Sequence, residues 1–114
     1  MSLATTLTQT DQNHPPLVLI HGLGSAATAF KPIIPALAQS FRVITVDLPG
    51  HGNSTYSKGQ AMDPKSLGRS VFESVESEYG IDKFHVAGNS LGGWIALEMA
   101  ADKPERIESL TALA

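Results

Sequence analysis

A serine flanked by glycines, Gly88-Asn89-Ser90-Leu91-Gly92, restricts the fold of this chain more than any other stretch. The pattern Gly-x-Ser-x-Gly is typical of a sharp turn between a strand and a helix, which lifts the serine hydroxyl into an exposed position. Glycines two places to either side let the strand and the helix pass close to each other. We therefore expect Ser90 at the point where a buried strand gives way to a helix.

The residues on both sides of Ser90 agree with such a turn. Residues 84–87 form a short apolar run that predicts a buried strand, and residues 91–101 are rich in helix formers. The N-terminus of that helix would point its positive end and its unpaired N–H groups at Ser90, which favours negative charge there. A serine that attacks a carbonyl group generates such charge, whereas an ordinary tight turn has no use for it. We expect the helix to pack through one apolar face, made of Trp94, Leu97, Ala100 and Ala101.

Short apolar runs predict three further strands, at residues 17–20, 41–46 and 110–114. Continuous apolar runs are typical of parallel strands that are covered on both faces. Because helical patterns separate these runs, we predict an α/β fold with a doubly wound, mainly parallel sheet and helices on both faces. Residues 1–14 are largely polar, and there we expect a flexible N-terminal tail with at most one edge strand around residues 4–8.

Two helices are predicted between the first three strands. The first spans residues 28–39, although Pro32 and Pro35 limit where its first regular turn can begin. The second begins after Asp63, a good N-cap that is followed by a proline, and ends at Gly80. Its apolar residues recur at four-residue spacing and predict packing against the sheet: Leu67, Val71 and Val75.

Two glycine-rich loops follow the predicted strands at 17–20 and 41–46. They are His21-Gly22-Leu23-Gly24-Ser25 and residues 47–54. In a doubly wound sheet, ligands bind beyond the carboxyl ends of the strands, where the strand order reverses. If the strand at 17–20 neighbours the strand before Ser90, the first loop can present a backbone N–H opposite the N–H of Leu91. Two such donors would form an oxyanion hole.

The first loop also fits a different motif. Gly22-Leu23-Gly24-Ser25-Ala26-Ala27 has the form G-x-G-x-x-A of a dinucleotide-binding fingerprint, and Asp47 has the spacing of a ribose-binding acid. Two prolines in the early turns of the next helix disagree with a smooth phosphate-binding start, and His21 has no part in that fingerprint. We therefore prefer the interpretation that joins the first loop to Ser90.

Three motifs in order, His-Gly-Leu-Gly-Ser at 21–25, Asp-Leu-Pro-Gly-His-Gly-Asn-Ser at 47–54 and Gly-Asn-Ser-Leu-Gly-Gly at 88–93, together resemble the amino-terminal half of an α/β-hydrolase. The resemblance covers residues 15–114. It implies that Ser90 is the nucleophile of a nucleophile elbow, with the backbone N–H groups of Leu23 and Leu91 as the oxyanion hole. Other residues would shape the site: His21, Gly22, Gly24, Gly88, Asn89 and Gly92.

The same resemblance places the acid and the histidine of the triad after the strand at 110–114, beyond these residues. Neither His51, in a loop that builds the wall of the site, nor His85, a packing residue in a strand, is expected to replace that base. We expect a truncated serine hydrolase that is inactive alone, whose open sheet edges are covered by self-association or by the missing half. The alternative is a non-catalytic, hydrolase-like binding or interaction module.

Composition narrows the class of partner. The net charge of -3 is mild, and no basic stretch suggests a nucleic acid. No apolar run is long enough for a membrane span and no signal peptide is evident, so we expect a cytoplasmic protein. The chain has no cysteine, which excludes disulfides and thiolate metal sites. The resemblance calls for no metal or organic cofactor and implies a small-molecule substrate with an ester or related carbonyl group.

Overall fold

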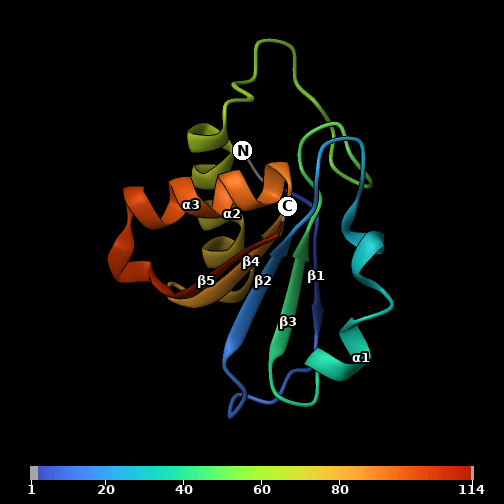
Figure 1. Ribbon diagram of the computed structural model, residues 1–114. Helices are drawn as coiled ribbons and strands as arrows, with labels where there is room; N and C mark the ends of the chain where they lie inside the picture. Colours follow the sequence, from blue (N-terminus) through green and yellow to red (C-terminus); the bar gives the residue numbers. More distant parts are fainter. Residues whose placement is uncertain (1–2, 114) are drawn as a thin grey trace.

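The computed structural model describes residues 3–113 and shows one five-stranded sheet (Figure 1). The strand order is β1-β3-β2-β4-β5, and every neighbouring pair is parallel except β1 with β3. This arrangement confirms the predicted doubly wound, mainly parallel sheet. The strands are β1 (Thr5–Thr8), β2 (Pro16–Ile20), β3 (Arg42–Val46), β4 (Phe84–Asn89) and β5 (Ile107–Leu113).

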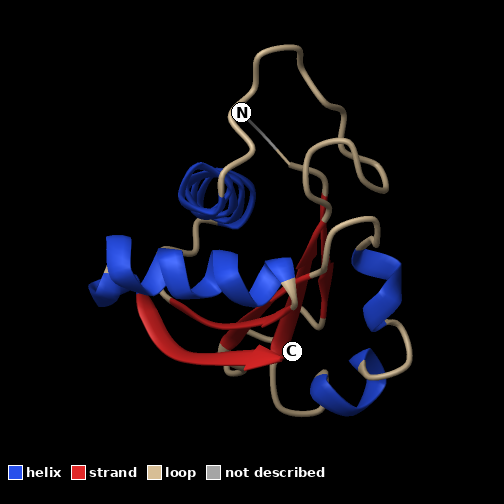
Figure 2. Ribbon diagram, turned by 45° about the horizontal axis from the view of Figure 1, so that its top comes forward, coloured by secondary structure: helices blue, strands red, loops and turns tan. Residues whose placement is uncertain are grey.

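Helices lie on both faces of the sheet, as predicted (Figure 2). The long helices α2 (Pro64–Tyr79) and α3 (Leu91–Asp102) pack on what we call the covered face. The short helices η1 (Ala27–Phe30) and α1 (Ile34–Leu37) pack on the opposite side, which we call the open face. A further short turn of helix, η2 (Pro104–Arg106), leads into β5.

Helix α2 begins and ends as its sequence predicts. The Asp63 carboxylate accepts a hydrogen bond from the Ser66 N–H at 3.1 Å, Pro64 occupies the first turn, and Gly80 ends the helix with a positive φ of 68°. The predicted apolar stripe faces the sheet. Leu67, Val71 and Val75 are buried, together with Gly68, Phe72 and Ser74.

The prediction of one helix over residues 28–39 is wrong. The structure has two short pieces, η1 and α1, with turns between and after them. A proline inside a continuous helix has no N–H to donate, and its ring collides with the carbonyl four residues earlier. Pro32 lies between the two pieces and Pro35 lies in the first turn of α1, where a proline is tolerated.

The edge strand expected around residues 4–8 is present as β1, at the edge of the sheet. The expected looseness of the tail is wrong for residues 3–8, which are bonded to the rest of the fold. β1 pairs with β3 with Thr5 opposite Val46, and the Leu3 side chain is 6% exposed. The Leu3 N–H donates to the Ser74 hydroxyl at 2.8 Å. These partners are distant in sequence, so the polar composition of this stretch gave no sign of them. Residues 1 and 2 lie outside the described residues.

The predicted packing face of α3 is also wrong. Trp94 and Leu97 are 57% and 54% exposed, while the buried side of the helix carries Gly92, Gly93, Ile95, Ala96 and Met99. The first turn of the helix lies so close to the strands that glycines occupy the contact line there, whereas Ile95 and Met99 pack further along the helix. The strand predicted at 110–114 begins earlier, as β5 from Ile107, and Ala114 lies outside the described residues.

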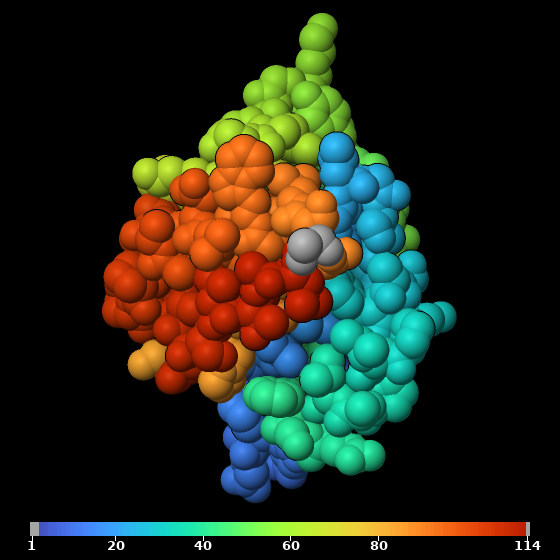
Figure 3. Space-filling view, in the orientation of Figure 1, coloured from blue at the N-terminus to red at the C-terminus, as the bar shows by residue number. Residues whose placement is uncertain are grey.

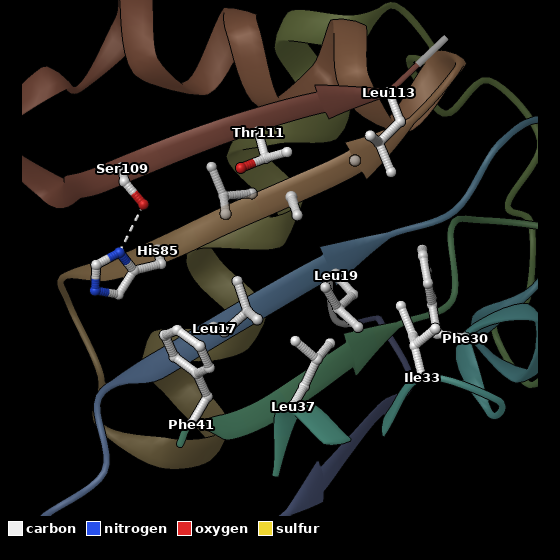
Figure 4. Close-up of a pocket in the computed structure, with 13 residues that line it drawn as sticks. Leu17, Leu19, Phe30, Ile33, Leu37, Phe41, His85, Ser109, Thr111 and Leu113 are labelled. Atoms are coloured by element: carbon white, nitrogen blue, oxygen red, sulfur yellow. Dashed lines mark hydrogen bonds between the residues drawn. The ribbon is translucent and has the colours of Figure 1, made fainter. Parts of the chain in front are cut away.

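The open face is only partly covered by η1 and α1. Beyond them lies an apolar groove of about 300 Å³ against β4 and β5, with β2 at its floor (Figure 3, Figure 4). His85 lies in this groove as a packing residue, edge-on to Phe41 with ring centroids 5.7 Å apart, and its Nδ1 is 2.6 Å from the Ser109 hydroxyl. The other labelled lining residues are Leu17, Leu19, Phe30, Ile33, Leu37, Thr111 and Leu113.

Candidate active site

Three loops meet at the carboxyl ends of the central strands (Figure 1). β2 pairs with β3 on one side and with β4 on the other, so the loop after β2 lies between the other two. The strand order reverses at this point, because the chain passes from β2 to β3 on one side and later reaches β4 on the opposite side. Such a reversal is where ligands bind in open α/β sheets.

Ser90 lies between β4 and α3 with φ 55° and ψ -115°, and it is exposed to solvent. A positive φ is costly for a residue with a side chain and persists only where the surroundings enforce it. Here the Ser90 N–H donates to the Leu113 carbonyl at 2.8 Å, and the Ser90 carbonyl accepts from the N–H groups of Gly93 and Trp94. These bonds hold the turn from both sides.

The flanking glycines are required by close backbone contacts. A Cβ on Gly88 would overlap the Gly92 carbonyl, and a Cβ on Gly92 would overlap the Ile20 carbonyl. Any side chain at either position would push β4, α3 and β2 apart. Asn89, the last residue of β4, is exposed beside the turn.

The loop after β2 touches the Ser90 turn. A Cβ on Gly22 would lie 3.4 Å from both the Asn89 carbonyl oxygen and the Ser90 Cβ. The loop itself is a tight turn in which the Ser25 N–H donates to the Gly22 carbonyl at 3.1 Å and Gly24 has φ 76°. The structure thus brings together the two segments that were predicted to face each other.

The two predicted oxyanion donors are the backbone N–H groups of Leu23 and Leu91. Leu91 is the first residue of α3, where backbone N–H groups have no partner within the helix. Within residues 3–113, no hydrogen-bond acceptor is found for either N–H. A hydroxyl at the N-terminus of a helix suits a group that gains negative charge.

His21 is buried, at 1% exposure, and joins the first loop to the loop after β3. Its Nε2 accepts the Leu48 N–H at 3.0 Å, and its Nδ1 lies 2.7 Å from the Gly22 carbonyl, to which it must donate. The ring is therefore neutral, with its proton on Nδ1. Burial is the main cause that lowers the pKa of His21 below its ordinary value of 6.5.

Asp47, at 6% exposure, ties the same two loops together a second time. Its carboxylate accepts the Ala27 N–H at 2.8 Å and the Asn53 N–H at 3.1 Å. Gly52, with φ 50°, lies so close that any Cβ there would overlap the carboxylate. Since the carboxylate is buried and bonded to backbone, it cannot bind a ribose, which removes the dinucleotide interpretation of the first loop.

His51 is the site residue whose contacts sequence reasoning missed. We assigned it only to the wall of the site, but its Nε2 accepts the Gly24 N–H at 2.9 Å. Its ring centroid lies 5.1 Å from that of His21. The contact joins residues 27 apart and depends on β2 and β3 being neighbours, so no local pattern predicts it. The only sequence signal for this contact was that the two glycine-rich loops each carry a histidine.

Two searches cover residues 3–113. No group of three histidine, cysteine, aspartate or glutamate side chains in this part of the chain is placed to hold a metal ion. Nor does any helix here have both the length and the apolar character that crossing a membrane requires.

Comparison with known proteins shows which family and which proteins this chain resembles. Residues 15–114 match the family model described as alpha/beta hydrolase fold. A pimeloyl-(acyl-carrier protein) methyl ester esterase of Legionella pneumophila is 38% identical over 95 residues. The dihydrolipoyllysine-residue acetyltransferase component of an acetoin cleaving system from Pseudomonas putida is 40% identical over 99 residues. The crystal structure of the enol-lactonase from Burkholderia xenovorans LB400 superimposes with a TM-score of 0.86 at 29% identity.

The matches cover most of this chain but a minor part of each relative. They span 83% of the chain and 36% of the esterase, and 87% of the chain and 26% of the acetyltransferase component. For the enol-lactonase the shares are 95% of this chain and 41% of the other. The chain is thus similar to roughly a quarter to two fifths of these proteins.

Proposed function

This chain belongs to the α/β-hydrolase family, as its match over residues 15–114 shows, and on that basis we propose that Ser90 is the nucleophile of a serine hydrolase. The relatives named as an esterase and a lactonase support a hydrolase-type enzyme. The observation that carries the proposal is the backbone of Ser90. Its φ of 55° is a strained conformation that holds an exposed hydroxyl at the N-terminus of α3.

The reaction that suits this arrangement is acyl transfer to water. The Ser90 Oγ attacks the carbonyl carbon of an ester and passes its proton to a general base, while the carbonyl oxygen becomes an oxyanion. The N–H groups of Leu23 and Leu91 hold that oxyanion. The tetrahedral intermediate then expels the alcohol, which takes the proton from the base. Water attacks the acyl-serine in the same way, releasing the carboxylic acid and restoring Ser90.

We propose that the base and its acid partner come from a part of the protein beyond these residues. His21 and His51 have both ring nitrogens engaged with backbone groups, which leaves neither free to take the Ser90 proton. His85 lies in the groove of the open face, in contact with Ser109 and Phe41. Residues 15–114 would then be the amino-terminal half of the core domain, which fits the 36% share of the esterase.

An isolated 114-residue chain would accordingly be inactive. Without a base, a serine hydrolase keeps only roughly 10³- to 10⁴-fold acceleration over water, from the oxyanion hole and binding. The groove and the β5 edge would be covered by the remaining half of the protein or, in the isolated chain, by self-association.

The substrate class follows from the relatives. One is named for a methyl ester and one for an enol-lactone, both of which present a carbonyl carbon bonded to oxygen. We therefore propose a small-molecule ester or related carbonyl compound as the substrate. No observation on the described residues favours a non-catalytic binding module over this enzyme.

A serine-directed fluorophosphonate probe tests the proposal in the native source of the protein. Mass spectrometry of the labelled material should place the probe on Ser90, in a polypeptide heavier than the 12.1 kDa of these residues. Ser90→Ala should abolish labelling. A matched control is Ser109→Ala, because Ser109 is also exposed and has His85 beside it, but lies in the groove of the open face.

Two outcomes would contradict the proposal. Labelling that persists in Ser90→Ala would remove Ser90 as the nucleophile. Turnover of an activated ester by the purified 114-residue chain at the usual rate of an esterase, on the order of 10 per second, would show that no base from elsewhere is needed.

A further inference from the structure

The ring of His51 connects the loop after β3 to the tip of the loop after β2. Its Nε2 accepts the Gly24 N–H at 2.9 Å, and its Nδ1 lies 3.0 Å from the Pro49 carbonyl oxygen. A carbonyl only accepts hydrogen bonds, so Nδ1 carries the proton, and an N–H only donates, so Nε2 is bare. The two bonds can coexist in one form of the ring alone, the neutral Nδ1–H tautomer.

One other hydrogen bond crosses the tip of the first loop, from the Ser25 N–H to the Gly22 carbonyl at 3.1 Å, and it lies within the loop itself. The Leu23 side chain is 75% exposed, and a Cβ on Gly24 would meet no atom within 4 Å. Packing therefore does not fix the peptide between Leu23 and Gly24. The hydrogen bond that the Gly24 N–H donates to His51 Nε2 anchors this turn to the loop after β3. The Leu23 N–H belongs to the adjoining peptide of the same turn, so its direction depends on that anchor.

The base of the same loop is held independently. The Asp47 carboxylate binds the Ala27 N–H, and the buried His21 ring binds the Leu48 N–H. Gly22 packs directly against Ser90. Loss of the His51 contact would thus free the tip of the loop while the rest of the site stays in place.

We propose that His51 is a positioning residue: its neutral ring holds the Leu23–Gly24 turn in the shape that binds the oxyanion, and its protonation releases that turn. The inference rests on the proposed role of the Leu23 N–H. Protonation places a hydrogen on Nε2, which then opposes the Gly24 N–H donor to donor, so the bond is lost.

The surroundings of the ring allow this change. His51 is partly exposed, so solvent protons reach it, whereas His21 is buried. Two titratable groups lie close by: His21, from the loop after β2, with ring centroids 5.1 Å apart, and Asp47, at the end of β3, which lies against Gly52, the residue after His51. Both accept hydrogen bonds from backbone N–H groups, contacts in which the His51 ring takes no part.

Nuclear magnetic resonance on the 114-residue chain tests the contact without any activity. Long-range ¹H–¹⁵N spectra at pH 8 should show His51 as the Nδ1–H tautomer. As the pH is lowered from 8, the Gly24 amide signal should shift with the same midpoint as the His51 ring. An Nε2–H tautomer at pH 8, or a Gly24 signal that ignores the ring, would overturn the inference.

Two variants separate the role of His51 as a hydrogen-bond acceptor from the effect of its protonation. In His51→Gln the amide oxygen can replace Nε2 as the acceptor of the Gly24 N–H but takes no proton at these pH values. In His51→Leu the acceptor is gone. At pH 8 the Gly24 amide should exchange its hydrogen roughly 3- to 10-fold faster in His51→Leu than in His51→Gln, which is the effect of one ordinary hydrogen bond. Equal exchange in the two variants would count against the proposal.

The catalytic consequence is measured in the full active protein with an ester substrate. His51→Leu should lower kcat by roughly 10- to 100-fold with little change in KM, as expected for a displaced oxyanion donor. His51→Gln should recover most of that loss, and the ratio of its kcat to that of the wild type should rise as the pH falls. A constant ratio would contradict the pH role, and the ratio cancels any titration of the general base, because the two proteins share it.

The two proposals fail separately. If Ser90→Ala keeps its activity while the Gly24 amide follows the His51 ring, the nucleophile is wrong and the contact stands. If Ser90→Ala is inactive while Gly24 ignores the ring, the hydrolase assignment stands and the role of His51 is wrong.

Discussion

The two faces of the sheet are covered by helices to very different degrees. On the covered face, α2 and α3 bury a continuous core that includes Phe72 and Phe84, with ring centroids 5.7 Å apart. On the open face, three buried side chains, Leu17, Leu19 and Val43, have the short η1 and α1 for cover, and a groove remains beside them. Most of the buried core therefore lies on one face, and the other face is only partly covered.

The difference also separates stability from the candidate site. The three loops that meet at the carboxyl ends of β2, β3 and β4 are tied by hydrogen bonds of their own, from His21, Asp47 and His51. These bonds do not depend on the groove. The site can thus be well formed in a chain whose open face is incomplete.

The largest expected effect is on the covered face, where α3 meets β2. In Gly92→Ala the new Cβ would overlap the Ile20 carbonyl, a backbone group that cannot move aside, so we expect a loss of more than about 3 kcal/mol in the free energy of unfolding. Gly93→Ala is the matched control. Its Cβ would lie 3.2 Å from the Gly88 carbonyl, and the better helix propensity of alanine offsets part of that contact.

Urea denaturation followed by circular dichroism measures both glycine variants. We expect Gly93→Ala within about 1 kcal/mol of the wild type. Similar losses for the two would mean that the approach of α3 to the strands is looser than described.

A pair of leucine truncations compares the two faces directly. Leu67→Ala removes a side chain that is 1% exposed on α2 and should cost about 3 kcal/mol, since it leaves a cavity in the core. Leu37→Ala removes a half-buried side chain on α1, at the groove, and should cost about 1 kcal/mol.

The denaturant midpoints of the two leucine variants show how fully each face of the sheet is buried. Equal losses would break the comparison, because they would show that something in solution buries the open face as fully as α2 and α3 bury the other.

A smaller effect is expected from pH, at the carboxyl ends of the strands. The pKa of His21 is lowered in the folded protein, so the unfolded chain takes up this proton more readily. Its contribution to stability is complete above about pH 6.5, the ordinary value, and is lost as the pH falls toward the folded-state pKa. Thermal denaturation at a series of pH values should show a steeper decline for the wild type than for His21→Gln, in which the residue does not titrate. Parallel curves would assign the acid sensitivity to other groups.

The smallest effect on stability is predicted within the groove. Thr111→Glu places a charge among the groove residues but replaces an exposed side chain, so the free energy of unfolding should change by less than about 0.5 kcal/mol. If the isolated chain self-associates through this face, the charge should reduce that association in sedimentation velocity experiments. Ala101→Glu adds the same charge to the exposed side of α3 and serves as the control. A change in association in the control alone would place the contact elsewhere.

Local sequence signals predicted those parts whose causes are local. The cap at Asp63, the apolar stripe that follows and the turn at Gly80 gave the length of α2 nearly to the residue. Apolar runs gave the central strands β2 and β3, because a strand buried on both faces needs no partner to be recognised. The pattern around Ser90 correctly placed it between β4 and α3.

Predictions that depended on distant partners went wrong or were not made. The apolar residues Trp94 and Leu97 suggested a packing face for α3, but the close approach of Gly92 to the Ile20 carbonyl turns those side chains outward. The pairing of β1 with β3 buries Leu3, which the polar residues around it in the sequence did not predict.

By itself, the sequence determined the alternation of strands and helices, the sharp turn at Ser90 and the two glycine-rich loops, since propensity, caps and turn chemistry act between near neighbours. Only the tertiary structure decided which strands lie side by side, and that choice brought Gly22 against Ser90 and His51 to the Gly24 N–H. Hydrogen bonds between loops are set by the order of the strands that carry them, and strand order is a property of the whole sheet.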